Sequence, residues 1–161
     1  MKQNMPLKNI CHSKLRLVRL HSRKLTIFSY TAWLNKYEAW YSSRPLIGVI
    51  GGRLDHTLGN VSLLLMLDAR GKRAKVLDDY SEMEIVSDKP ARIEDRYPYF
   101  SLLNISGLAR GITIQNAKFP LSNAEIPCEY QYGISNEVLP GMTAEVSVQA
   151  GRLLLIKILH R

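Results

Sequence analysis

The 161-residue chain has few cysteines and no long hydrophobic run. Its two cysteines, Cys11 and Cys128, lack the spacing of a disulfide framework or a zinc site. This scarcity predicts a reducing, cytoplasmic setting, with both cysteines as inert packing residues. The longest apolar stretches, LIGVI at 46–50 and LLLML at 63–67, are far shorter than the roughly 18 residues of a membrane-spanning helix, so no membrane partner is expected.

Acidic residues are almost missing from the first 45 positions. Glu38 stands there against nine Lys or Arg, whereas residues 46–161 hold thirteen charges of each sign. The net charge of +8 therefore belongs to the N-terminal stretch, and this distribution argues against nucleic acid as a partner of the folded body. Residues 1–44 are consistent with an organellar transit segment, a nucleic-acid-binding arm, or a stretch without an evolved role, such as an out-of-frame translation.

The region before residue 72 predicts a fragment of an α/β unit. YTAWLNKYEAWY at 30–41 has aromatic residues at helical spacing, and LIGVI at 46–50 has the length of a buried strand. A helix is expected from Leu54 to Ala69, with Gly71 as its stop. The spacing predicts that its core-facing residues are Leu54, Leu58, Val61 and Leu65.

The region from residue 72 onward is rich in short Val, Ile, Leu and Phe stretches separated by Asp, Gly, Pro and Asn. We expect strands within 74–79, 82–88, 99–106, 111–119, 144–149 and 152–159. Residues 143–159 predict a hairpin that turns at Gly151. The fold class is therefore α+β: a basic segment (1–44), a strand–turn–helix remnant (45–71) and an antiparallel β-sandwich (72–161).

The stretch GGRLDHTLGN, residues 51–60, places polar side chains where a strand leads into a helix. Ligands of open α/β sheets bind at such turns. Glycine allows close backbone approach, arginine donates to phosphate oxygens, and an aspartate suits Mg²⁺. The candidates are Gly51, Gly52, Arg53, Asp55, His56 and Asn60. An ordinary capped helix start, with Asp55 as the cap, explains the spacing equally well.

Four segments in order resemble the thiamine pyrophosphokinase (thiamine diphosphokinase) family over about residues 46–161. GGRLDHTLGN is similar to the family's Gly-Gly-Arg-x-Asp-His-x-Leu-x-Asn signature. The other three are SGLARGITIQNAKFPLSN (106–123), YGISNEV (132–138) and AEVSVQAGRLLLIKI (144–158).

The resemblance implies a catalytic α/β domain, a thiamine-binding β-sandwich, and a homodimer with active sites between subunits. The reaction implied is diphosphate transfer from Mg²⁺·ATP to the hydroxyl of thiamine, which gives thiamine diphosphate and AMP. By position, Asp55 would hold Mg²⁺ and Arg53 the phosphates, with His56 and Asn60 in support. Ser135 and Asn136 would hydrogen-bond the aminopyrimidine; a plain β-turn is the alternative for these two residues.

The chain departs from the family pattern before residue 46. The Asp-rich segments that bind metal and nucleotide in the family have no counterpart here, since Glu38 is the only acid before Asp55. The expectation is therefore a thiamine pyrophosphokinase that is shortened at its N-terminus and impaired by this. The alternatives are a non-catalytic thiamine-binding or dimerisation module and, third, a nucleic-acid binder that uses the basic stretch.

Overall fold

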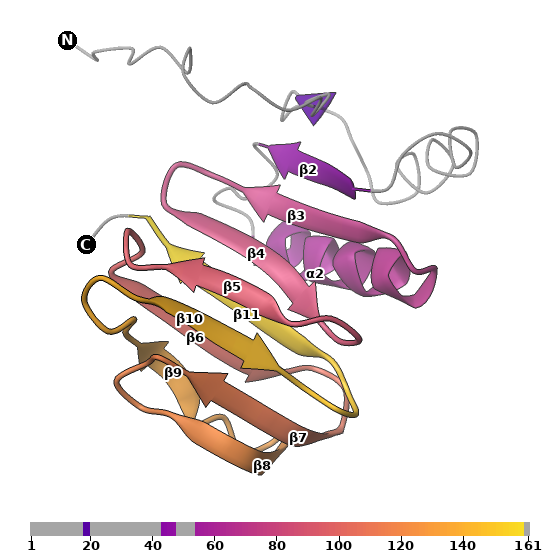
Figure 1. The fold of residues 1–161 in the computed structure, drawn as a ribbon. Coiled ribbons are helices and arrows are strands. Elements are labelled where there is room, and N and C mark those ends of the chain that lie inside the picture. Colours follow the sequence, from indigo (N-terminus) through magenta and orange to yellow (C-terminus); the bar gives the residue numbers. More distant parts are fainter. Residues whose placement is uncertain (1–17, 20–42, 48–53, 160–161) are drawn as a thin grey trace, which may run out of the picture.

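The computed structural model describes residues 18–19, 43–47 and 54–159, which form two sheets and one helix (Figure 1). The larger sheet has seven strands in the order β1-β2-β3-β4-β11-β6-β9, and the smaller has four in the order β5-β10-β7-β8. The elements are β1 Val18–Arg19, β2 Ser43–Ile47, α2 Leu54–Ala69, β3 Arg73–Leu77, β4 Ser81–Val86, β5 Ala91–Glu94, β6 Tyr99–Asn104, β7 Leu108–Gln115, β8 Leu121–Pro127, β9 Gly133–Asn136, β10 Thr143–Ser147 and β11 Leu153–Ile158.

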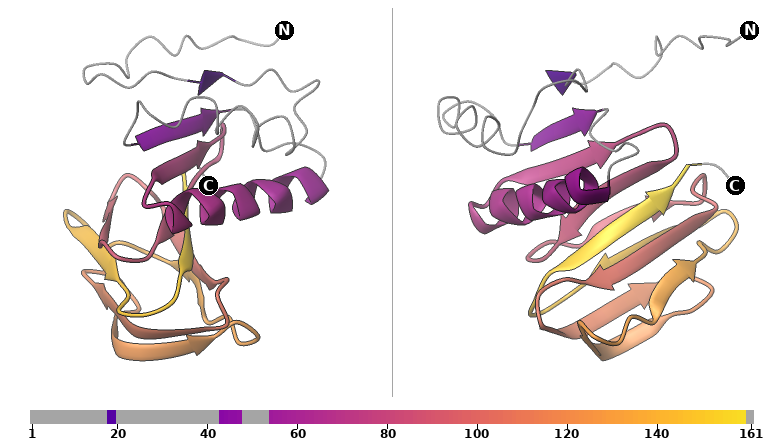
Figure 2. Two further views of the ribbon diagram at one scale, coloured as in Figure 1. Left: turned by 90° about the vertical axis from the view of Figure 1, so that its right-hand side faces the viewer. Right: turned by 180° about the vertical axis from the view of Figure 1, so that it is seen from behind.

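The fold is a β-sandwich with a helix on its outer side. In the larger sheet β1, β2 and β3 run parallel, and the pairings from β3 to β9 are antiparallel. One face of this sheet packs on the smaller, antiparallel sheet, and α2 lies on the other face (Figure 2). The α+β fold class predicted from the sequence is confirmed.

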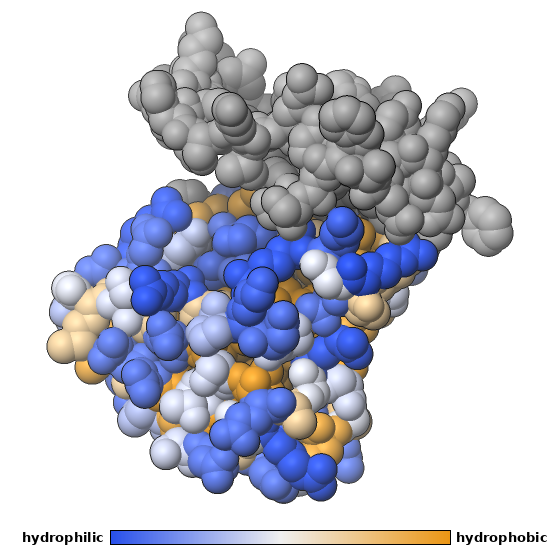
Figure 3. Space-filling model, turned by 45° about the vertical axis from the view of Figure 1, so that its right-hand side comes forward, coloured by the Kyte–Doolittle hydropathy of each residue, from blue (hydrophilic) through white to orange (hydrophobic). Residues whose placement is uncertain are grey.

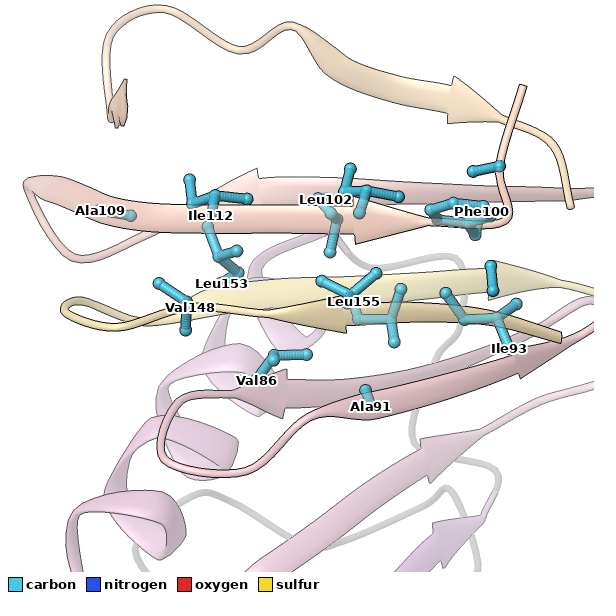
Figure 4. Close-up of a cluster of buried hydrophobic side chains, with 14 of the residues drawn as sticks. Val86, Ala91, Ile93, Phe100, Leu102, Ala109, Ile112, Val148, Leu153 and Leu155 are labelled. Carbon is cyan, nitrogen blue, oxygen red and sulfur yellow. The ribbon is translucent and has the colours of Figure 1, made fainter. Parts of the chain in front are cut away.

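The sandwich core lies between the two sheets because alternate residues of each strand point inward. On β6, Phe100 and Leu102 are buried while Ser101 and Leu103 are only half-buried, and β7 and β11 contribute further apolar side chains (Figure 4). The fully buried large side chains in this core are Phe100, Ile93, Leu102, Ile112, Ile126, Leu153, Leu155, Val86 and Val146.

Helix α2 begins and ends at the predicted residues. The N–H of Lys72 bonds to the carbonyl of Leu67 at 2.9 Å, and the N–H of Gly71 bonds to that of Asp68 at 2.8 Å. With Gly71 at φ 67°, these two bonds form a Schellman cap, for which glycine is the favoured residue.

The predicted apolar side of α2 is only partly correct. Leu54 and Leu58 are exposed, Val61 is partly buried, and the fully buried residues of the helix are Leu63, Leu64 and Leu67. These three pack on β3, β4 and Leu154 of β11, so the helix is held against the sheet mainly by its second half.

The predicted hairpin at 143–159 is also wrong. β10 pairs with β5 and β7 in the smaller sheet, whereas β11 pairs with β4 and β6 in the larger one. Gly151 adopts φ 98° in a connection that crosses between the sheets. Four strands were not predicted: β1, β5, β8 and β9.

A buried ion network joins β3, β4 and β11. The Lys157 ammonium contacts Glu82 at 2.9 Å and Glu84 at 2.7 Å, and Lys75 reaches Glu82 at 2.6 Å. The Tyr97 hydroxyl donates to the second oxygen of Glu82. Burial raises the pKa of Glu82, but the hydrogen bonds from Lys75 and Lys157 outweigh it and bring this pKa to about 2.

Several sequence predictions fall outside the described residues. These are the helix at 30–41, Gly51, Gly52, Arg53 and Cys11, and the expected strand at 46–50 overlaps β2 only at residues 46–47.

The predicted packing role of Cys128 is wrong because its side chain is exposed. Its hydrogen bond to Glu129 raises the pKa of the thiol, which disfavours the reactive thiolate. No helix in the described part of the chain has the length and apolar character needed to cross a bilayer.

Candidate functional site

The first turns of α2 present the polar residues of the GGRLDHTLGN stretch. Asp55 and His56 are exposed, and Asn60 is half-buried. His56 and Asn60 are four residues apart and so share one side of the helix. Asp55 lies in the first turn, where a carboxylate interacts favourably with the positive end of the helix dipole.

This end of the helix offers one carboxylate for a metal ion. Among residues 54–159, no three His, Cys, Asp or Glu side chains gather into a group that could hold a metal. Nucleotide-bound Mg²⁺ is usually held by one or two carboxylates together with phosphate oxygens. Asp55 therefore fits a role as one ligand of a phosphate-bound Mg²⁺, but it does not form a protein-only metal site.

Strand β9 carries the other predicted residues at the free edge of the larger sheet, beside β6. Gly133 lies so close to β6 that a Cβ there would be 2.7 Å from the carbonyl oxygen of Leu102. Ser135 is exposed and adopts φ 58°, and its N–H donates to the hydroxyl of Ser101 at 3.0 Å. The β-turn alternative for Ser135 and Asn136 is wrong, since both belong to a paired strand.

Asn136 connects the two sheets. Its side chain is buried: Nδ2 donates to the carbonyl of Phe119 at 2.8 Å, and Oδ1 accepts the N–H of Phe119 at 3.0 Å. The same oxygen accepts the N–H of Glu137 at 2.9 Å. The carboxamide thereby fixes the β7–β8 connection beside the end of β9.

Apolar and aromatic side chains are exposed around this edge. Ile134 on β9 is 55% exposed, Tyr132 just before β9 is 49% exposed, and Phe119 is 58% exposed. Lys118 lies 5.6 Å from the Phe119 ring centroid and pairs with Glu137 at 2.9 Å. Sequence reasoning did not single out Phe119 as a site residue, although the FPLSN segment contains it. In the view of Figure 3, apolar patches of this kind are small and separated by hydrophilic side chains.

The two groups of predicted residues lie apart within one chain. The buried residues of α2 contact β3, β4 and β11, and β6 separates β11 from β9. Leu54 and Leu58 in the first turns of α2 are exposed, and Figure 2 shows the N-terminal end of the helix standing away from both sheets. The structure therefore does not bring Asp55 and Ser135 together in a single chain.

The two stacked sheets, with a helix on the outer face of the larger one, define the described part of the chain as an α+β fold with a β-sandwich. Residues 84–153, which include the whole β9 edge, match the family model described as "Thiamin pyrophosphokinase, vitamin B1 binding domain". Residues 84–153 therefore carry the vitamin B1 binding domain of the thiamine pyrophosphokinase family.

Individual relatives agree with this assignment. Thiamine pyrophosphokinase of Bacillus subtilis is 28% identical over 96 residues, which are 58% of this chain and 45% of the relative. The crystal structure of the B. subtilis protein matches with a TM-score of 0.72 at 25% identity, over 80% of this chain and 60% of that one. The crystal structure of thiamin pyrophosphokinase from Geobacillus thermodenitrificans matches with a TM-score of 0.69 at 28% identity, over 80% of this chain and 59% of that one. The chain thus spans about half the length of its curated relative.

Proposed function

We propose that the chain binds thiamine at the β9 edge and that it transfers diphosphate from Mg²⁺·ATP to the bound thiamine. The observation that carries the proposal is that the exposed, left-handed Ser135 lies within the segment that matches the vitamin B1 binding domain. Thiamine has an aminopyrimidine ring with several hydrogen-bonding groups. The Ser135 hydroxyl is positioned to bond to this ring, and the exposed ring of Phe119 offers an aromatic face.

Asn136 would contribute in two ways. Its predicted hydrogen bond to the aminopyrimidine remains a proposal. Its bonds to Phe119 already hold the β7–β8 connection beside Ser135, so the residue also organises the surface on which thiamine would lie.

We assign catalysis to the N-terminal end of α2, where Asp55 lies in the first turn. In the proposed reaction the thiamine hydroxyl oxygen attacks the β-phosphorus of ATP, the bond to the α–β bridging oxygen breaks, and AMP leaves. Asp55 would hold the Mg²⁺ that ATP carries, and Arg53, Gly51 and Gly52 would contact phosphate oxygens. His56 and Asn60, on one side of the helix, would support them. The metal supplies charge stabilisation, while the protein supplies alignment of the two substrates.

The geometry favours a homodimer with its sites between subunits. Asp55 and Ser135 lie apart in one chain, so a site that uses both needs residues from two copies. The exposed Ile134 of β9 and the exposed Tyr132 just before it offer apolar surface for such a contact.

The second candidate is a non-catalytic thiamine-binding or dimerisation module. It is favoured by the single carboxylate at the α2 end and by the lack of a metal-binding group among residues 54–159.

Turnover and binding assays separate these functions. Incubation of the purified chain with thiamine and Mg²⁺·ATP should give thiamine diphosphate and AMP in equal amounts. Asp55→Asn should lower turnover at least about 100-fold while leaving the thiamine Kd unchanged, because the proposed metal ligand lies apart from the β9 edge. The matched control is Asp79→Asn, another exposed aspartate, which should retain activity. Thiamine binding without product in the wild type supports the module instead.

Mixing of variants tests the shared site. Ser135→Arg would place a long side chain over the proposed thiamine surface. Asp55→Asn and Ser135→Arg chains should each be inactive alone and should recover about a quarter of wild-type turnover when mixed in equal amounts. Random pairing makes half of the dimers heterodimers of the two variants. In each heterodimer one of the two sites contains neither substitution, so a quarter of all sites are intact. Mixtures that stay inactive, although the chains exchange, contradict a site between subunits.

A further inference from the structure

The backbone at Ser135 is held in a conformation that a serine does not favour. Left-handed φ values cost a non-glycine residue about 1–2 kcal/mol, and Ser135 has φ 58°. The register between β6 and β9 explains why this conformation is needed. Phe100 pairs with Asn136 and Leu102 with Gly133, so Ile134 and Ser135 together oppose Ser101. The extra residue makes a β-bulge, which redirects the side chain at the edge.

Ser101 supplies the hydrogen bond that this bulge needs. Its neighbours Phe100 and Leu102 point into the sandwich core, so Ser101 lies on the opposite face of the sheet. From there its hydroxyl oxygen accepts the N–H of Ser135 at 3.0 Å. On the other side of Ser135, the buried Asn136 is fixed to Phe119. The left-handed residue is therefore held from both sides.

We infer that Ser101 is a positioning residue for the ligand that binds at Ser135. By bonding to the backbone of Ser135, it turns the Ser135 side chain outward and leaves its hydroxyl exposed. A glycine at position 135 would adopt this backbone without strain, so the serine at this position indicates that its side chain has a task. The inference rests on the proposed thiamine site, and it assigns to Ser101 a role that acts only through Ser135.

A double-mutant cycle tests this dependence in the full-length chain, with thiamine affinity measured by calorimetry. Ser101→Ala should raise the thiamine Kd about fivefold, which corresponds to the loss of one hydrogen bond. Ser101→Thr keeps the hydroxyl and should restore most of the affinity. In a Ser135→Ala background, Ser101→Ala should cause no further loss, because the hydroxyl that it positions is already gone.

The control is Ser87→Ala, which removes a serine hydroxyl bonded to Asp68 at 2.7 Å, near the other end of the same sheet. It should leave the thiamine Kd unchanged. An unchanged thiamine Kd in Ser101→Ala overturns the inference. The inference is also overturned if Ser101→Ala raises the Kd equally in the wild-type and Ser135→Ala backgrounds.

Hydrogen exchange of the Ser135 amide separates this inference from the proposed function. Ser101→Ala should make that amide exchange about tenfold faster, since its acceptor is lost. A wild-type chain that does not bind thiamine overturns the proposed function, whatever this exchange rate is. An unchanged exchange rate shows instead that Ser101 does not hold the bulge.

Discussion

The sandwich and the α2 layer share the larger sheet, but they bury their apolar residues to different extents. In the described part of the chain, sixteen buried residues join the sandwich core and seven join the cluster under α2. The sandwich closes its core with its own two sheets. The helix covers the other face with only its second half, and Leu54 and Leu58 remain exposed.

This difference separates the two proposed activities. The ligand edge at β9 is fixed by β6 on one side and by the Asn136–Phe119 bonds on the other. Asp55 and His56, in the first turns of α2, are exposed and precede the buried residues of the helix. The proposed thiamine binding therefore depends on strands of the sandwich, whereas the proposed catalysis depends on the exposed end of the helix.

Cavity-forming substitutions should give the largest difference in stability between the sandwich core and the α2 layer. Phe100→Ala removes a fully buried ring from the sandwich and should lower the free energy of unfolding by about 4 kcal/mol. Leu64→Ala, under α2, should cost about 2–3 kcal/mol and act mainly on the helix layer. Urea unfolding measures both losses, and hydrogen exchange locates them. If Leu64→Ala accelerates exchange in β7 as much as in α2, the two regions form one cooperative unit.

The buried ion network gives the next largest effect. Lys157→Met leaves the buried Glu82 and the half-buried Glu84 with the half-exposed Lys75 as their remaining cation, and should destabilise the protein by about 3 kcal/mol. Lys75→Met is the matched control and should cost at most about 1 kcal/mol, since its side chain is 43% exposed. Urea midpoints at neutral pH compare the two, and equal losses contradict the assigned burial.

The same network predicts an acid dependence of stability. The pKa of Glu82 is lowered from 4.5 to about 2, so its contribution is present above pH 4.5 and is lost as the pH falls toward 2. Lys157→Met removes one of the bonds that lower this pKa, so the acid-dependent loss should be smaller and should be complete at a higher pH than in the wild type. Urea midpoints measured between pH 2 and 6 test this, and parallel profiles for wild type and variant contradict it.

Local features of the fold were predictable from the sequence. The bounds of α2 follow from the turn before it and from Gly71, and most sandwich strands follow from their alternating apolar residues. The hairpin error has a physical reason: a glycine turn between two apolar stretches is compatible with pairing in one sheet and with a crossover between sheets. Strands β8 and β9 were not predicted because they are edge strands, which bury few residues. On β8, for example, only Ile126 is buried.

The candidate site was predictable only in part. The YGISNEV segment marks the β9 edge, and Ser135 and Asn136 both lie there. The contact between Ser101 and Ser135 depends on the register of two strands that are more than thirty residues apart in sequence, and no local pattern encodes it. The distance of Asp55 from this edge likewise depends on strand order.

Substitutions at two glycines, one in each region, should give the smallest difference in stability. Gly151 packs against β7, and a Cβ there would lie 2.8 Å from the Cα of Ala109, so Gly151→Ala should cost about 2–3 kcal/mol. Gly71, at the end of α2, has no atom within 4 Å of a Cβ and only the strain of φ 67°. Gly71→Ala should therefore cost about 1 kcal/mol, or roughly 3 °C in Tm. Thermal unfolding of both variants measures the difference; a Gly71 variant that is as unstable as the Gly151 variant would mean that the helix end is packed as tightly as the sandwich.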